Sequence, residues 1–210
     1  RIGFPVVVKP RNGTFSRHVT THITNHEELD EAIKKVRHYS PTCIVETYLE
    51  HMSVYRITVI NAQDVFCAKQ ERASIEGDGV HTINELVTKK SLRRRAHPVL
   101  EPLILNKKSD EVLQKQNLTR KSIPKATERV YIQDDPFLRL GGDITEVTDT
   151  LHPDNRKLAI DVALSSGMSI VGIDLMTQDI RKSWKESTAA ILELNEMPCI
   201  EIHKYPSEGT

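Results

Sequence analysis

The chain has 210 residues, of which 38% are apolar and 28% charged, a balance typical of a globular protein with a core of its own. No apolar run approaches the roughly 18 residues of a membrane span. The three cysteines, Cys43, Cys67 and Cys199, form no C-x-x-C pair that would indicate a disulfide framework or a zinc knuckle. We expect a soluble cytoplasmic protein. Because the first residue is Arg1, close before a strand-like run, we also expect a segment of a longer chain whose flanking domains are missing.

The 29 basic and 29 acidic side chains cancel but are unevenly distributed. Residues 89–129 carry 12 basic and 4 acidic groups, and residues 130–210 carry 7 and 14. We interpret the basic belt, Lys89, Lys90 and Arg93–Arg95, as a solvated helix face, with an acidic peptide partner as the alternative. Nucleic-acid binding is not expected, because only 5% of residues are aromatic and none interleave with the belt. The acidic tail suits divalent cations that bridge to phosphate.

The first part of the chain predicts strand, loop, strand, helix and strand in that order. Residues 5–9 are a short β-branched run, and residues 18–23 alternate in polarity. Asn25 is placed to cap a helix with apolar 3-4 spacing that ends before Pro41. Residues 43–46 form the next strand.

The middle of the chain predicts a hairpin and then a helix. Residues 55–60 and 65–69 are strands joined by the turn Asn-Ala-Gln-Asp. A second turn, Gly77-Asp78-Gly79, precedes Thr82, which caps a helix with an apolar stripe. Residues 91–129 are polar, basic and of mixed helical character, and we interpret them as an insertion.

Strand signals return at Val130 and continue through residues 144–147. His152-Pro153 opens a helix that Gly167 closes. Two further strands, residues 169–176 and 189–195, flank a charged connector. Because several strands are paired as hairpins, we expect an α+β fold with mixed or antiparallel sheets rather than a doubly wound parallel sheet.

The last two strands carry a candidate metal site. Glu193 and Asn195 are two positions apart on one strand, so they share a face, and Leu192 and Leu194 should then face the core. If the strand that bears Asp174 pairs beside this one, two carboxylates and an amide oxygen converge, which suits Mg²⁺. The alternative is a set of half-exposed polar strand residues.

Three further segments are candidates for nucleotide binding. Lys9 ends an apolar strand and precedes a loop with Gly13, so it could place an ammonium group on a phosphate, or be only a strand-terminal lysine in solvent. Glu46, Thr47, Tyr48 and Leu49 end a second strand whose backbone could hydrogen-bond an adenine edge. Gly141 and Gly142 could offer amides to an anion, or form only a turn.

Taken in order, these pieces resemble the ATP-grasp superfamily of carboxylate-amine ligases, and within it the cyanophycin synthetase type. The matching strings are FPVVVKP at 4–10, VETYL at 45–49, RASIEGDGVHTINEL at 72–86, LGGDITEVTD at 140–149, HPDN at 152–155, GIDL at 172–175 and ELNEMPCIEIHKYPSEG at 193–209. The GDG-HTI and ELNE-P blocks are the specific ones. Bifunctional glutathione synthetases share the first block, and acetylglutaminylglutamine-type ligases share the G-G, T-D, H-P and N-E-P pattern.

The resemblance implies a small lobe at 1–52, truncated at its start, and a larger lobe at 53–210 with a basic insertion at about 91–136. A nucleotide would lie between the lobes. Lys9 and Gly13 would contact phosphate, Glu46 and Thr47–Leu49 adenine, and Asp174, Glu193 and Asn195 Mg²⁺. Gly141 and Gly142 join this nucleotide-binding set, and Arg72 and Arg139 would steady an acyl phosphate.

The implied activity is ATP-driven activation of a carboxylate as an acyl phosphate, followed by amine attack that gives an amide, ADP and phosphate. An amino acid or an acidic peptide would be the substrate, and copies of the chain could associate. We expect the 210-residue segment alone to have little turnover.

Three departures from the family pattern leave an alternative open. Bulky residues follow Gly13 where the family has further glycines, no carboxylate stands at Ser53 or Val54 for ribose, and Cys199 replaces a small glycine. The alternative that follows from them is a degenerate module that binds nucleotide without catalysis. A ligase of the glutathione synthetase or acetylglutaminylglutamine synthetase type is a further alternative, because those ligases share the sequence blocks named above.

Overall fold

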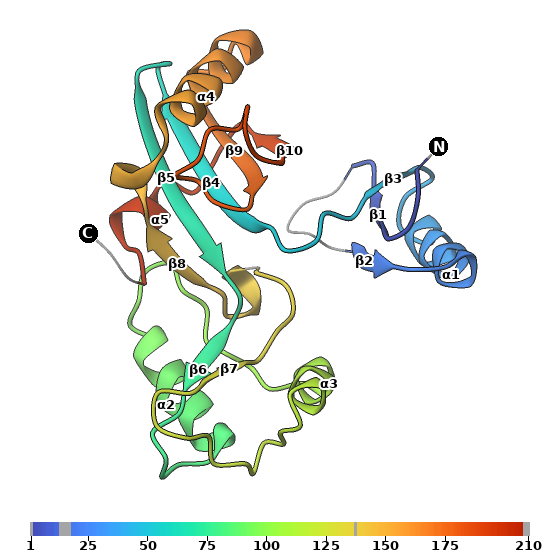
Figure 1. The fold of residues 1–210 in the computed structure, drawn as a ribbon, viewed down its shortest axis with the longest axis vertical. Coiled ribbons are helices and arrows are strands. Elements are labelled where there is room, and N and C mark those ends of the chain that lie inside the picture. The colour runs from blue at the N-terminus through green and yellow to red at the C-terminus, as the bar shows by residue number, and fades with distance from the viewer. Residues whose placement is uncertain (1, 13–17, 137, 208–210) are drawn as a thin grey trace. The chain divides into compact units, whose positions relative to one another are not determined.

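The computed structural model describes residues 2–12, 18–136 and 138–207, and the chain divides into two compact units, Arg1–His51 and Met52–Thr210. Figure 1 shows the order of their helices and strands. Within the described ranges, no helix combines the length and the apolar character needed to cross a membrane. Gly13 lies outside the described residues.

The first unit is a three-stranded antiparallel sheet covered by one helix. Its strand order is β2 (Thr20–Ile23), β1 (Val6–Pro10), β3 (Cys43–Thr47). Helix α1 (His26–Arg37) begins as predicted at Asn25, whose side chain accepts a hydrogen bond from the Glu28 backbone N–H. The buried core joins the two layers through Val6, Val8, Ile23, Ala32 and Val36.

The second unit is built on a five-stranded sheet. Its order is β10 (Ala189–Asn195), β9 (Ile170–Thr177), β4 (Ser53–Ile60), β5 (Asp64–Glu71), β8 (Asp143–Glu146), and every pair is antiparallel. The predicted α+β class is confirmed, with antiparallel sheets throughout the described residues. Alternate residues of the central strands, such as Ile57 and Ile173, form the largest buried cluster.

Helix α4 (Pro153–Ser166) covers that apolar face, and it begins and ends as predicted. His152 caps its start, and Gly167 ends it in a left-handed conformation with φ of 69°. Asn155, which is 1% exposed, donates to the carbonyls of Ile180 and Lys182 and accepts from the Trp184 N–H. The HPDN string therefore caps the helix and fastens the charged connector to it.

Residues 73–132, which contain most of the segment interpreted as an insertion, pack as a layer with an apolar core of their own. Strands β6 (Ser74–Glu76) and β7 (Arg129–Tyr131) pair, and helices α2 (Ile83–Arg94) and α3 (Lys107–Lys115) pack against them. Thr82 caps α2 as predicted, in a reciprocal capping box with Glu85. The residues that share this core run from Ala73 to Ile132. Two short 3-10 turns, Leu138–Leu140 and Thr148–Thr150, follow.

The interpretation of the basic belt as a solvated face is wrong for two of its members. Arg94 is only 4% exposed; it donates to the carbonyls of Glu101 and Gly142 and pairs with Asp143 at 2.5 Å. Lys90 pairs with the other oxygen of Asp143 at 2.5 Å. The cause is the helix period, which places both side chains on the buried face of α2.

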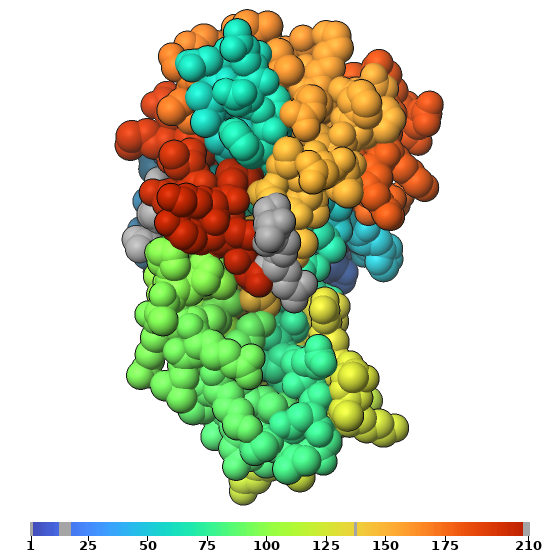
Figure 2. Space-filling model, turned by 90° about the vertical axis from the view of Figure 1, so that its left-hand side faces the viewer, coloured from blue at the N-terminus to red at the C-terminus, as the bar shows by residue number. Residues whose placement is uncertain are grey.

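The C-terminal segment crosses the sheet face opposite α4. Its short helix α5 (Glu201–Lys204), which was not predicted, buries Ile202 in a cluster with Ala68, Leu100 and Ile144. Ser207 then bonds both ways with the backbone of Ile144 on β8. Figure 2 shows this segment, in red, lying against the first part of the insertion, in light green.

Candidate functional site

A row of three charged side chains crosses neighbouring strands on the face of the sheet away from α4. Arg56 on β4 lies opposite Asp174 on β9, and Asp174 lies opposite Glu193 on β10. Their sequence neighbours, such as Ile57 and Ile173, point to the other face and into the α4 core. The pairing of β9 with β10, on which the predicted metal site depends, is therefore present.

Asn195 completes the cluster. Its side-chain nitrogen lies 3.4 Å from Asp174 Oδ2 and 3.4 Å from Glu193 Oε1, so the amide contacts both carboxylates. The structure thus brings the three predicted metal ligands together. Asp174 is buried, with 8% exposure, whereas Glu193 is exposed at the edge strand.

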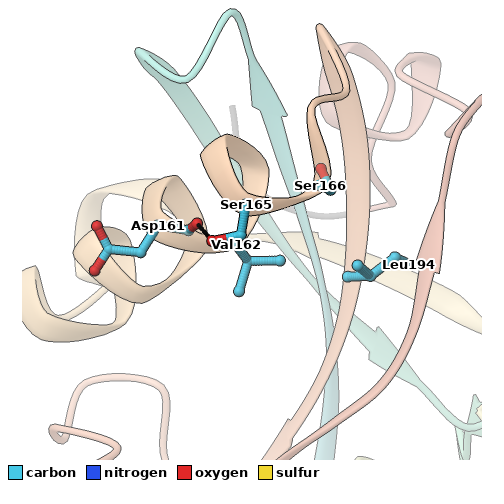
Figure 3. A pocket seen from close by; sticks show the side chains of 5 residues that line it. All are labelled: Asp161, Val162, Ser165, Ser166 and Leu194. Atoms are coloured by element: carbon cyan, nitrogen blue, oxygen red, sulfur yellow. Dashed lines mark hydrogen bonds between the residues drawn. The ribbon is translucent and has the colours of Figure 1, made fainter.

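Neither Leu192 nor Leu194 is buried, since they are 37% and 40% exposed, although Leu194 lies opposite Ile173 and points to the α4 face as expected. Strand β10 is at the edge of the sheet, and its pairing with β9 shifts between Ile191 and Glu193. Leu194 lines a shallow depression of about 320 Å³ beside α4, with Val162 on the opposite wall (Figure 3). This depression lies on the α4 face, so it is separate from the carboxylate cluster.

Sequence reasoning missed Arg56. Its Nε donates to Asp174 Oδ1 at 2.5 Å and its Nη2 donates to Oδ2 at 3.0 Å, a two-pronged ion pair. The available signal was a cation within a β-branched strand, directly before Ile57-Thr58-Val59-Ile60, where a charged side chain without a partner would be costly.

The electrostatics of the cluster suit a cation. Partial desolvation and the hydrogen-bonded Asp174 carboxylate raise the pKa of Glu193, while Asn195 and Arg56 oppose that shift. Two carboxylates held this close favour a bound positive charge, and their oxygens are the hard donors that Mg²⁺ takes. The Asn195 amide presents its nitrogen to them here, and turning the amide over would bring its oxygen into the donor set. In the described part of the chain, no group of three or more His, Cys, Asp or Glu side chains is arranged to hold a metal. Two carboxylates and one amide are fewer ligands than the octahedron of Mg²⁺ takes, so this donor set would leave positions for other oxygen ligands.

In the first unit, the two charged residues predicted to bind nucleotide are paired with each other. Lys9 Nζ lies 2.7 Å from Glu46 Oε2, across the antiparallel pair of β1 and β3. The Tyr48 N–H donates to the Pro5 carbonyl, Thr47 is exposed and Leu49 is half-buried. The ion pair fixes the position of the Lys9 ammonium group at the end of its strand.

The remaining predicted residues lie near the insertion. Gly141 and Gly142 are buried; the Gly141 N–H donates to Leu138 and the Gly142 carbonyl accepts from Arg94. Gly141 has φ of 89°, and a Cβ there would meet Leu103, so the turn needs glycine. Arg72 stacks on the Tyr131 ring, 3.8 Å from its centroid, and Arg139 is exposed. Their roles stay predictions.

A second polar group on the same sheet face was not predicted. The His203 ring bonds Glu146 at 3.0 Å through Nδ1 and Thr58 at 2.9 Å through Nε2. Burial alone would raise the pKa of Glu146, but hydrogen bonds from His203 and Thr148 lower it overall. These contacts fasten α5 to the sheet, so the turn after Asn195 is held from both sides.

Comparison with known proteins finds relatives that match this chain along nearly its whole length, although no family model matches. The chain is 34% identical over 213 residues to cyanophycin synthetase of Synechocystis sp., covering 99% of this chain and 24% of that protein. It is 30% identical over 210 residues to a glutathione biosynthesis bifunctional protein of Clostridium perfringens, covering 97% of this chain and 27% of the relative. The chain thus spans about a quarter of the length of these curated relatives.

The fold has a solved counterpart. The crystal structure of a bifunctional glutathione synthetase from Pasteurella multocida matches with a TM-score of 0.69 and 25% identity, over 98% of this chain and 28% of that one. The antiparallel sheets and the similarity to these proteins both agree with the resemblance that the sequence motifs indicated. The chain therefore belongs to the ATP-grasp superfamily and is of the cyanophycin synthetase type.

Proposed function

We propose that the protein is an ATP- and Mg²⁺-dependent ligase that forms amide bonds through an acyl phosphate. The observation that carries the proposal is the convergence of Asp174, Glu193 and Asn195 on one sheet face, in a chain similar along its whole length to cyanophycin synthetases. These three residues would hold Mg²⁺, which supplies charge neutralisation for the transferring phosphoryl group when bound.

The other residues are given roles that fit their positions. Lys9, oriented by Glu46, would donate to a phosphate oxygen, and the backbone of Thr47–Leu49 would bind adenine. Residues 1–52 and 53–210 would be the small and the larger ATP-grasp lobe, with the basic insertion in the latter. No protein nucleophile is required, because positioning and electrostatic stabilisation carry phosphoryl transfer.

The substrate is proposed to be an amino acid or an acidic peptide. The exposed members of the basic belt, Lys89, Arg93 and Arg95, support an acidic chain, because they do not pair with Asp143 as Lys90 and Arg94 do. Lys89 contacts the His81 ring, which is neutral or cationic, so its charge is not cancelled there. A cytoplasmic location and association of copies remain predictions.

The test is ATP consumption and product analysis with the full-length protein and candidate amino acids. Glu193→Gln should lower turnover by about a hundredfold or more, because a metal carboxylate contributes several kcal/mol to phosphoryl transfer. Glu186→Gln, an exposed carboxylate of the connector, is the control and should retain activity. Nucleotide binding without phosphate release in the unmodified protein would refute the ligase proposal and favour the degenerate module, which the bulky residues after Gly13 and the absent carboxylate at Ser53 or Val54 suggest.

A further inference from the structure

Arg56 forms an ion pair with Asp174, which is also one of the proposed metal ligands. Both Asp174 oxygens accept from its guanidinium, at 2.5 Å and 3.0 Å, so neither is bare in the absence of a metal. The two side chains are only 16% and 11% exposed, and little water screens the pair.

The surroundings leave Arg56 little freedom to move away. It lies directly opposite Asp174 in the register of β4 and β9. Gly172, two residues along β9, leaves room for the arginine stem: a Cβ there would come 3.2 Å from Arg56 Cδ and 2.7 Å from Pro198 Cβ. The guanidinium is thus a resident part of the site and not a surface cation that happens to reach it.

The charges determine what the site can accept. Asp174, Glu193 and Arg56 sum to one negative charge, so a free divalent cation meets a fixed positive group beside its ligands. A cation that arrives with a polyphosphate also brings negative charge to the guanidinium. The attraction between the polyphosphate and Arg56 then offsets the repulsion between the cation and Arg56.

We propose that Arg56 is a positioning residue that acts as a built-in counter-ion, making divalent-cation binding at Asp174 and Glu193 conditional on the nucleotide polyphosphate. The inference rests on the proposed function, since it assumes that these residues take a metal. Linkage then requires that the nucleotide and the cation raise each other's affinity by the same factor, and that this factor depends on the charge at position 56.

The experiment is a titration of the full-length protein with Mn²⁺, followed by electron paramagnetic resonance, alone and with a non-hydrolysable ATP analogue. The variants are Arg56→Gln and Arg56→Met, which remove the charge, and Arg56→Lys, which keeps it. Glu193→Gln gives the blank for other cation sites. Arg120→Gln is the matched control, because Arg120 makes the same two-pronged pair with Asp110, at 2.6 Å and 2.8 Å, in the insertion.

The proposal expects free Mn²⁺ to bind the Gln and Met variants at least about tenfold more tightly than the unmodified protein, because a like charge is removed. In these two variants, the factor by which the ATP analogue raises the Mn²⁺ affinity should fall to a similar extent. Arg56→Lys and Arg120→Gln should bind Mn²⁺ as the unmodified protein does. Free Mn²⁺ binding that is unchanged or weaker in both neutral variants would overturn the inference and leave the ligase proposal standing.

Two measurements on the unmodified protein keep the outcomes separate. If Mn²⁺ binds equally well with and without the analogue, in a way that Glu193→Gln abolishes, the metal site stands and the counter-ion role is overturned. If no Glu193-dependent Mn²⁺ binding occurs with the analogue, both the proposed function and this inference are overturned.

Discussion

Replacing Arg94 by Met should destabilise the second unit strongly. The guanidinium is 4% exposed and makes three bonds, to the Glu101 carbonyl, the Gly142 carbonyl and Asp143, the first and last at 2.5 Å and the Gly142 bond at 2.8 Å. Removing one partner of a buried pair generally costs about 3–5 kcal/mol, because the other charge remains buried. Asp143 keeps Lys90 as a partner, so we expect about 2–4 kcal/mol here.

The assay is urea unfolding followed by circular dichroism, with Arg95→Met as the control. Arg95 is the next residue along the chain, at the exposed C-cap of α2, and its replacement should change the free energy of unfolding by less than about 0.5 kcal/mol. Equal losses in the two variants, or no loss in Arg94→Met, would show that the buried arginine does not hold the insertion to β8.

Three further predictions concern the same unit. Gly172→Ala should cost about 1–3 kcal/mol, since its Cβ would come 2.7 Å from Pro198, whereas Gly3→Ala, with no atom within 4 Å, is the control in the same unfolding assay. Asn155→Ala should lose about 1–3 kcal/mol by releasing the connector, and proteolysis near Trp184 should accelerate; unchanged proteolysis would contradict this. The lowered pKa of Glu146 means that its stabilisation is fully present above the ordinary value of 4.5 and is lost as pH falls through the folded-state value. The stability difference between the unmodified protein and Glu146→Gln should therefore shrink as the pH falls below 4.5, and a difference that grows on acidification would refute the assignment.

Features determined by local chemistry were predictable from the sequence. Asn25, Thr82 and Gly167 mark helix ends because side-chain capping and positive φ are properties of a few adjacent residues. The approach of Asp174 to Glu193 followed from the period of two along a strand and the assumption that neighbouring strands pair.

Features that depend on register or on contacts between distant residues were not predictable. Arg56 meets Asp174 only because β4 and β9 align those two positions, which are 118 residues apart. His203 meets Glu146 through a helix of four residues, too short to show a period. Arg94 is different: it lies eleven positions after Ile83, on the same helix face, but its neighbours in a basic run concealed that phase.

The position of β10 at the end of the sheet has a consequence for laboratory work. Among the described residues no strand pairs with its outer side, which leaves a backbone ladder flanked by Ile191, Leu192 and Leu194, each 37% to 40% exposed. Exposed edge strands of this kind pair with strands of other chains unless a charged side chain prevents it. Glu193 is the acidic side chain among the apolar residues of this edge strand. Neutralising Glu193 therefore removes a proposed metal ligand and a barrier to self-association together. Light scattering should accompany every measurement on that variant, so that aggregation of the protein is not mistaken for loss of metal binding or activity.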